Sequence, residues 1–318
     1  MNPIGNSIAQ RTAFGETLVE MIAQDPRILV LDGDLANSTM AHLVAQRYPD
    51  HFLEMGIAEQ NMIGVAAGLA SVGFIPFIST FAAFAAKRDL DQVRIVVSQT
   101  ALHVIIAGAY SGIQTGKTGK THQSVQDLSI FRAMPNMTVI APADAVEVRK
   151  AMFALAFEQQ GPAYLRLTRD PFRDIFDDSY IFQIGKAVVL RTGTDITLIG
   201  TGEQTVRCLD AADILASKGF QAYVLHVPTL KPLDVDAIIA AAQKTGRVVT
   251  AEDHSIIGGL GSAVAETLGE CLPTPMIRVG LRDVYGESAP NNLLLEKYRL
   301  TPAHIAEAAQ QLIFGNQR

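Results

Sequence analysis

Three polar segments of the sequence contain residues that could bind a ligand or take part in catalysis. They are LDGDLANST at 31–39, EMGIAEQNM at 54–62 and AGAYSGIQTGKTGKTHQ at 107–123. Each follows a run of apolar residues that predicts a strand, and in parallel α/β sheets ligands bind beyond the carboxyl ends of strands. Glu59 is the last charge before the neutral stretch 60–86, so we expect it at the mouth of a buried helix.

Ordinary structural roles compete with these chemical ones. Asp32 and Asp34 follow a predicted strand and could simply cap the next helix. Glu59 could be a first-turn acid that complements the helix dipole. Phe81 and Phe84 are spaced three apart and could be plain core residues.

Several common functional motifs are excluded. The segment 112–119, GIQTGKTG, has one residue too few between its first glycine and the Gly-Lys pair for a Walker phosphate loop. The glycine cluster 258–263 does not directly follow a strand, so it is weak evidence for a dinucleotide site. His122 and His254 lack metal-ligand spacing, and no serine lies in a nucleophile elbow.

The composition indicates a soluble cytoplasmic globular protein. The 318 residues are 48% hydrophobic and 18% charged, with 26 basic against 32 acidic residues. Without a long basic stripe, binding to nucleic acid or to an anionic membrane is not expected. Two cysteines, Cys208 and Cys271, make neither a disulfide framework nor a zinc cluster. The amino terminus shows no secretory signal.

Alternating strand-like and helix-like segments predict two consecutive α/β domains with mainly parallel sheets covered by helices. The acidic, irregular segment 169–185 is the best boundary, which gives domains at 1–175 and 186–318. The first should contain strands at 27–31, 51–55, 74–78, 102–107, 137–141 and 163–168, and helices at 12–24, 40–47, 62–72, 81–93 and 144–159. The second should contain strands at 195–202, 221–227, 247–252 and 276–281, and helices at 205–218, 235–244 and 262–271.

The neutral stretch 60–86 is long enough to cross a bilayer. It is interrupted by Gly64, Gly68, Gly73 and Pro76, and it changes from helix-like to strand-like. We therefore interpret it as a buried helix followed by a buried strand. A glycine- and alanine-rich helix can also pack closely on a partner chain.

Taken together, the sequence resembles the carboxyl-terminal half of transketolase over nearly its whole length. The segments that carry the resemblance occur in the family's order: SIAQRTAFGETL, ILVLDGDLANST, EMGIAEQNMIGVAAGLA, FISTFAAF, THQSVQDLSIFRAMPN, LRLTRDP, TLKPLD and AEDHSIIGGLG. The resemblance implies a thiamine diphosphate enzyme fold, with a pyrimidine-binding domain followed by the transketolase C-terminal domain. The function it implies is transfer of a two-carbon ketol unit between sugar phosphates.

The resemblance also implies a partner subunit. The family's diphosphate-binding domain carries a G-D-G motif that holds magnesium, whereas the only G-D here is Gly33-Asp34-Leu35, in the wrong place. The chain therefore looks like the smaller subunit of a split transketolase. It should share the cofactor with an N-terminal subunit that holds Mg²⁺, in a heterotetramer of two copies of each subunit. The neutral helix after Glu59 would then lie in a large subunit interface.

By this resemblance, Glu59 is the catalytic carboxyl that hydrogen-bonds the cofactor's aminopyrimidine and promotes loss of the thiazolium C2 proton. Phe81 and Phe84 line the pyrimidine pocket, with Phe84 as the stacking partner, and His122 contacts the cofactor. The positions that match the family's binding site for the substrate's terminal phosphate are Arg11, Ser38 and Arg169. Guanidinium groups suit a phosphate because they present paired donors.

The sequence departs from the family in the segment 110–122. The family's substrate-binding histidine becomes Tyr110, and the aspartate that reads a substrate hydroxyl becomes Thr118. Lys117 and Lys120 replace a neighbouring acid and a proline. Loss of a hydrogen-bonding acid should relax or redirect sugar selection, so we expect a non-standard sugar or sugar-like acceptor.

Three alternatives remain open at this point. The β subunit of a 2-oxo acid dehydrogenase E1 component has similar length and the same catalytic glutamate. A half of a 1-deoxyxylulose-phosphate synthase is less fitting, because that enzyme is normally one long chain. A non-catalytic partner subunit is disfavoured by the presence of Glu59 and both phenylalanines.

Overall fold

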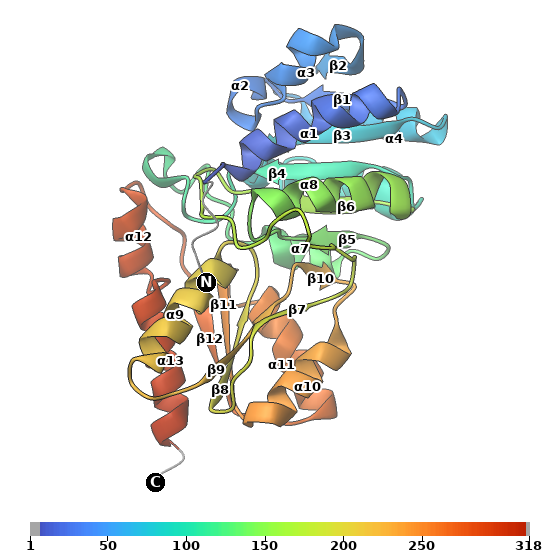
Figure 1. Ribbon diagram of the computed structural model, residues 1–318. Coiled ribbons are helices and arrows are strands. Elements are labelled where there is room, and N and C mark those ends of the chain that lie inside the picture. Colours follow the sequence, from blue (N-terminus) through green and yellow to red (C-terminus); the bar gives the residue numbers. More distant parts are fainter. Residues whose placement is uncertain (1–6, 316–318) are drawn as a thin grey trace.

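The computed structural model describes residues 7–315, so the first six residues of the predicted first domain lie outside the described residues. Two sheets lie one above the other in Figure 1, a seven-stranded sheet at the top and a five-stranded sheet below it. Both are mixed but mainly parallel, as expected from the alternation of strands and helices.

The first sheet has the strand order β10-β5-β6-β4-β3-β1-β2. Its strands run in parallel except β10, which pairs antiparallel with β5. Their bounds are β1 Ile28–Asp32, β2 Phe52–Glu54, β3 Ile75–Phe81, β4 Ile105–Ala109, β5 Thr138–Ile140, β6 Ala163–Arg166 and β10 Thr229–Lys231. Strands β1, β3 and β4 are buried along their whole length, which explains their continuous apolar sequences.

Helices cover both faces of this sheet. Apolar residues of α1, α3 and α8 form the core on one face, and those of α4 and α7 form the core on the other. The helix bounds are α1 Gln10–Gln24, α2 Ala36–Thr39, α3 His42–Arg47, α4 Glu59–Ser71, α5 Ala82–Ala85, α6 Leu90–Gln92, α7 Asp127–Ala133 and α8 Ala145–Phe153. Short 3-10 turns occur at Pro49–His51 and Gly116–Thr118, and π-helical turns follow α6 at Val93–Ser98 and α8 at Ala154–Glu158.

The second sheet has the order β12-β11-β8-β9-β7, with β7 antiparallel to β9. Its strands are β7 Val188–Arg191, β8 Ile196–Gly200, β9 Ala222–His226, β11 Val248–Ser255 and β12 Met276–Leu281. The helices of this part are α9 Gln204–Ala216, α10 Val235–Thr245, α11 Leu260–Cys271, α12 Asn291–Lys297 and α13 Pro302–Gly315. One hydrophobic cluster runs from α4 and α7 to α10 and α11, so the two parts of the chain share a core.

Most predicted elements are present, with ends shifted by a few residues, but the helix predicted over 81–93 is wrong. The chain forms α5, turns at residues 86–89 and then continues as α6 and a π-helical turn. Alanine has a high helix propensity, so the alanine-rich sequence gives no indication of the break at residues 86–89. The same stretch shows no sign of spanning a membrane, because within residues 7–315 no helix is both long and apolar enough.

Candidate active site

Glu59 begins α4 and is almost completely buried. Its Oε1 accepts a hydrogen bond from Arg88 Nη1 at 2.6 Å and lies 3.5 Å from the hydroxyl of Thr80 on β3. Its Oε2 is buried and has no hydrogen-bond partner in the described part of the chain. A buried carboxyl oxygen without a partner is costly, so this atom is poised to accept a donor from a ligand.

Aromatic side chains gather near the carboxyl ends of β3 and β4. Phe81 stacks on Tyr110 with ring centroids 4.2 Å apart, and on Phe84 with centroids 5.7 Å apart. His122 meets Phe84 edge-on at 5.5 Å. The structure therefore brings Phe81, Phe84 and His122 together with Tyr110, although they are distant in sequence.

The two arginines predicted to bind an anion converge on Tyr110, whereas Ser38 contacts Arg11 through its backbone carbonyl. Its ring lies 5.6 Å from the guanidinium carbon of Arg11 and 5.4 Å from that of Arg169. Arg11 Nη1 donates to the Tyr110 hydroxyl at 3.1 Å and to the Ser38 carbonyl at 3.0 Å. Within residues 7–315 neither arginine forms an ion pair with a carboxylate, so two uncompensated cations share one end of the site.

The turn that carries Ser38 is held by Asp32. The Asp32 carboxylate accepts from the Leu35 backbone N–H at 2.6 Å and from the Thr39 hydroxyl at 3.0 Å. Burial raises the pKa of Asp32 to about 6, although these hydrogen bonds act in the opposite direction. Asp32 thus holds the turn that carries Ser38, but the predicted helix cap is wrong, because the N-cap of α2 is Leu35 and no side chain caps it.

Thr118 is not part of this group. It is exposed, and its hydroxyl donates to the Thr115 carbonyl at 3.1 Å. Arg169 Nη1 donates to the same carbonyl at 3.3 Å, so Thr118 is linked to the anion site only through the loop backbone.

Side chains from the second part of the chain hold the loop that follows Tyr110. The Asp253 carboxylate accepts from the Ile113 backbone N–H at 3.1 and 3.2 Å and from Gln114 Nε2 at 3.3 Å. Gln114 also donates to Glu203 Oε1 at 3.0 Å. Burial, and then the charge of Asp253, raises the pKa of Glu203 to about 7. The C-terminal part therefore positions the loop of the candidate site.

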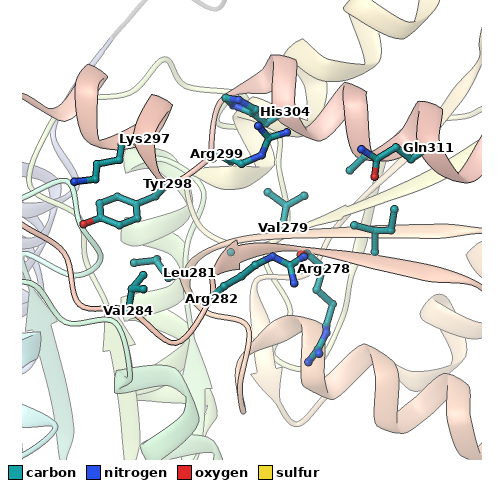
Figure 2. Close-up of a pocket in the computed structure, with 13 residues that line it drawn as sticks. Arg278, Val279, Leu281, Arg282, Val284, Lys297, Tyr298, Arg299, His304 and Gln311 are labelled. Carbon is teal, nitrogen blue, oxygen red and sulfur yellow. The ribbon is translucent and has the colours of Figure 1, made fainter.

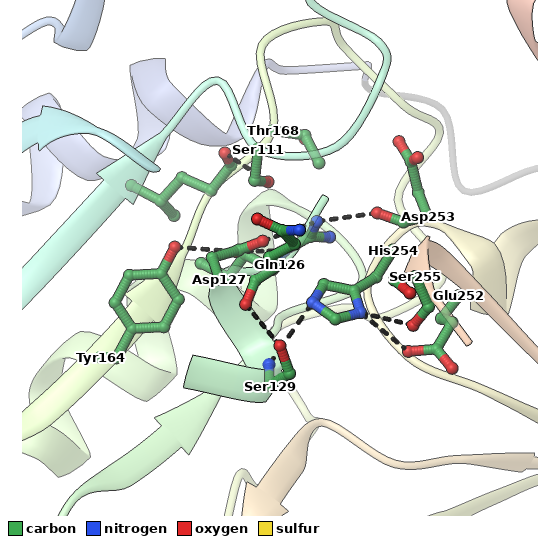
Figure 3. Close-up of polar contacts among 12 residues, drawn as sticks. Ser111, Gln126, Asp127, Ser129, Tyr164, Thr168, Glu252, Asp253, His254 and Ser255 are labelled. Atoms are coloured by element: carbon green, nitrogen blue, oxygen red, sulfur yellow. Dashed lines mark hydrogen bonds and ion pairs between the residues drawn. The ribbon is translucent and has the colours of Figure 1, made fainter. Parts of the chain in front are cut away.

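A second buried network, drawn in Figure 3, joins the two parts beneath this loop. Asp127 accepts from Arg166 Nε at 2.7 Å and from the Tyr164 hydroxyl at 2.8 Å, and Arg166 Nη2 donates to the Asp253 carbonyl at 2.8 Å. His254 lies beside Ser129 and accepts from its backbone N–H through Nε2 at 3.4 Å. Burial favours the neutral acid, but the charge of Arg166 outweighs it and holds the pKa of Asp127 below its ordinary value. The bonds from Arg166 to Asp253 and from Ser129 to His254 cross between the two parts of the chain, whereas those to Asp127 lie within the first part.

Two residues that the sequence reading missed complete the site. Arg88, which binds Glu59, also stacks its guanidinium 4.1 Å from the centroid of the Phe84 ring. Asp89 is fully buried with both carboxyl oxygens unpaired in the described chain, and burial raises its pKa to about 8. Both lie in the turn that was predicted as continuous helix, so no helical spacing could relate them to Glu59.

An open groove lies elsewhere, between β12 and α13 (Figure 2), and has a volume of about 340 Å³. Its lining is basic, but these cations already have partners. Arg278 and Arg282 donate to backbone carbonyls, and Lys297 and Arg299 form ion pairs with Glu287 and Glu307. None of the sequence-predicted site residues lines this groove, so it is a poorer candidate.

The residues around Glu59 fit the aminopyrimidine of thiamine diphosphate. The unpaired Glu59 Oε2 offers an acceptor for a ring N–H, Phe84 offers a stacking face, and His122 borders it. Among residues 7–315, no three His, Cys, Asp or Glu side chains gather in a group that could hold a metal ion.

Family models agree with this geometry. Residues 6–174 match the transketolase pyrimidine binding domain, and residues 185–305 match the transketolase C-terminal domain.

Similar proteins cover nearly the whole chain. A 6-deoxy-6-sulfo-D-fructose transketolase subunit from Clostridium sp. (strain MSTE9) is 44% identical over 95% of this chain and 94% of its own length. One of the subunits of an apulose-4-phosphate transketolase from Phocaeicola vulgatus is 36% identical over 97% of this chain and 98% of its own length. A solved structure of a split gene transketolase, an inactive beta4 tetramer, superimposes with a TM-score of 0.90 at 45% identity and covers 96% of this chain and 98% of its own.

Proposed function

The chain belongs to the transketolase family, a family of transferases that implies thiamine diphosphate as cofactor, and from that premise we propose that it is the C-terminal subunit of a split, cytoplasmic transketolase. It would transfer a two-carbon ketol unit between sugar derivatives once an N-terminal subunit has joined. The observation that carries this proposal is the buried Glu59 Oε2, which has no partner in the described chain, in a carboxyl that Arg88 links to the Phe84 ring.

We assign Glu59 to the ring nitrogen of the aminopyrimidine. Its Oε2 would accept the hydrogen bond there and exchange a proton with that nitrogen, and burial in α4 excludes water from the exchange. Phe84 would stack on the ring, while Phe81 and His122 limit how far it can tilt. When bound, the cofactor supplies a carbon nucleophile and an electron sink for the ketose carbonyl.

The anionic end of the substrate would bind at Arg11, Ser38 and Arg169. Two guanidinium groups without carboxylate partners in the described chain can bind phosphate or sulfonate through paired donors. Tyr110 lies between them and fixes Arg11 by accepting its hydrogen bond. Thr118, with the exposed Lys117 and Lys120, would be presented to the distal part of the substrate or to the partner subunit.

The substrate is proposed to be a non-standard sugar with an anionic terminus. Two relatives are named for 6-deoxy-6-sulfo-D-fructose and for apulose 4-phosphate, which are unusual ketoses with a charged end. Replacement of the family's substrate-binding histidine by Tyr110 and of its aspartate by Thr118 is consistent with an altered hydroxyl pattern. Magnesium and the diphosphate would be held by the partner.

An uncharged surface supports the proposed partner. The exposed side of α4 carries Gln60, Asn61, Gly64, Gly68 and Ser71. A Cβ built on either glycine would meet no atom within 4 Å, so this helix face is open in the free subunit. We propose that the partner packs here, within a heterotetramer of two copies of each subunit.

Reconstitution tests the function directly. The tagged subunit should co-purify from its source with a polypeptide that carries the G-D-G motif, and the two should be recombined with thiamine diphosphate and Mg²⁺. We expect ketol transfer from ketose phosphates or sulfonates by the complex, none by either subunit alone, and little from uncharged ketoses. Decarboxylation of pyruvate, or no transfer from any anionic ketose, would reject the proposal.

A further inference from the structure

Arg88 places its guanidinium between Glu59 and Phe84. Nη1 donates to Glu59 Oε1 at 2.6 Å, and the guanidinium carbon lies 4.1 Å from the Phe84 ring centroid. A planar, nitrogen-rich cation therefore makes both contacts that the proposed function requires of an aminopyrimidine. One contact is the stack on Phe84, and the other is a hydrogen bond to the Glu59 carboxylate.

Two other aromatic side chains already contact the Phe84 ring. Phe81 stacks against the same ring at 5.7 Å, and His122 meets it edge-on at 5.5 Å. A pyrimidine that stacks on Phe84 and bonds Glu59 would make the same two contacts that Arg88 now makes.

We propose that Arg88 takes the place of the aminopyrimidine in the cofactor-free subunit and is displaced when the cofactor binds. The inference rests on the proposed function, since it assumes that Glu59 and Phe84 hold the pyrimidine. Arg88 is thus a positioning residue, which keeps the Glu59 carboxylate and the Phe84 ring in their binding arrangement until the cofactor replaces it.

The buried charge of Glu59 explains why the cofactor-free subunit needs a cation at this position. The Glu59 side chain is 0% exposed, and a buried carboxylate is stable only with a hydrogen-bonded counter-ion. The neighbouring Asp89 competes little for Arg88 at pH 7, because burial raises its pKa to about 8 and keeps it mostly neutral. Thr80, 3.5 Å away, is too distant for a strong hydrogen bond.

Arg88 has room to move in the free subunit. Its side chain is 40% exposed, in contrast to Glu59. In the free subunit it lines a surface cavity of about 460 Å³ whose other walls include Gln60 and Asp91. The Asp91 carboxylate, which now pairs with Arg94 at 2.7 Å, offers the displaced guanidinium a new acceptor.

The test compares wild type with Arg88→Met, Arg88→Lys and the control Arg191→Met. Arg191 forms an exposed ion pair with Asp213 on the far sheet, so its variant removes an arginine without touching the site. Each subunit is measured alone for its midpoint of thermal unfolding. Each reconstituted complex is then titrated with thiamine diphosphate at fixed Mg²⁺ by calorimetry.

Arg88→Met should lower the stability of the free subunit and raise the affinity of the complex for thiamine diphosphate. The free subunit should unfold at a lower temperature, because Glu59 loses its strong donor. The complex should bind thiamine diphosphate about three- to tenfold more tightly, because the partly exposed ion pair between Arg88 and Glu59 no longer has to be broken. Arg88→Lys keeps the charge but loses the planar stack, so both of its values should lie between those of wild type and Arg88→Met. Arg191→Met should bind the cofactor like wild type.

Unchanged or weaker cofactor binding by both Arg88 variants would overturn the inference, since Arg88 would then be irrelevant to the pocket or a ligand of the cofactor. If the wild-type complex itself binds no thiamine diphosphate, the proposed function fails and the inference fails with it. The two failures are therefore distinguished by the wild-type titration.

Discussion

A single carboxyl oxygen carries most of the proposed chemistry. Glu59 Oε2 is buried without a partner in the described chain, while the other oxygen is already bonded. Replacement of Glu59 by Gln keeps the shape of the side chain but removes the exchangeable proton. We expect the complex to retain cofactor affinity within a few fold and to lose about 10²–10⁴ in kcat, the usual contribution of general acid–base catalysis.

Steady-state rates and cofactor titration of the reconstituted complex check this prediction. Glu20→Gln is the matched control, because Glu20 is partly exposed and, within residues 7–315, contacts the surface residues Arg149 and Gln24. Near-normal turnover by Glu59→Gln would show that another group moves the proton.

The two arginines beside Tyr110 should determine how the charged end of the substrate is bound. Replacing either Arg11 or Arg169 by Met removes a charged donor, which is worth about 1.5–3 kcal/mol and corresponds to about 10- to 100-fold in KM. The value of kcat should change little, because this contact is made equally in the ground state and the transition state.

The measurement compares KM for ketoses that differ only in the charge of their terminal group. Arg27→Met serves as the control, since Arg27 pairs with Asp25 at the surface. An equal loss of activity with charged and uncharged ketoses would contradict the assignment of an anion site.

At the scale of the element, substitutions on the uncovered face of α4 should change stability and assembly separately. Glycine inside a helix destabilises it by about 0.5–1 kcal/mol relative to alanine. Gly64→Ala and Gly68→Ala place a methyl group where nothing lies within 4 Å, so each should raise the free energy of unfolding of the isolated subunit by up to that amount. Gly68→Glu should leave the subunit folded but prevent assembly with the partner.

Chemical denaturation of the subunit measures the predicted change in stability, and analytical ultracentrifugation of the mixed subunits measures assembly. Gly269, in the second half of α11, is the comparison site because it too is a helical glycine with open space around it. Full assembly by Gly68→Glu would show that α4 does not form the interface.

Much of the architecture could be predicted from the sequence because its strands are buried and its helices are periodic. The runs ILVLD and IIAGA become central strands, and Asp144 caps α8 as expected by accepting from the Glu147 N–H at 2.8 Å. The break after α5 was missed because alanine carries no periodic signal. Strand β10 was missed because three residues, TLK, are too few to show an alternation.

The site was predictable only where a resemblance supplied the roles. Residues such as Arg11, Phe84 and His122 lie far apart in the sequence, and no spacing indicates that the sheet brings them together. The ion pair between Glu59 and Arg88 joins residues 29 apart across an unpredicted turn. Contacts of this kind depend on tertiary packing, which local patterns do not encode.

At the scale of the whole molecule, the buried Glu203 should make stability depend on pH. Its pKa is about 7 in the folded chain and is ordinarily 4.5, so unfolding releases a proton in the pH range between these values. The free energy of unfolding should therefore fall as the pH rises from about 4.5 to 7. Relative to wild type, Glu203→Gln should gain stability over this range by up to about 3 kcal/mol, at about 1.4 kcal/mol per pKa unit.

Urea unfolding of the two proteins at a series of pH values measures the difference. Glutamine can still accept the hydrogen bond from Gln114, so the buried contact is kept. Parallel stability curves for the two proteins would show that Glu203 ionises normally in the folded chain.

The pairing of β10 with β5 limits how this chain can be cut. Thr229–Lys231 comes from the second half of the sequence, yet it forms the border strand of the first sheet, next to Thr138–Ile140. A fragment ended at residue 175 would leave the backbone donors and acceptors of β5 open to other chains, which is a known route to aggregation. Gene splitting and domain exchange in this protein should therefore fail at the acidic segment 169–185, where the sequence alone would have placed the cut.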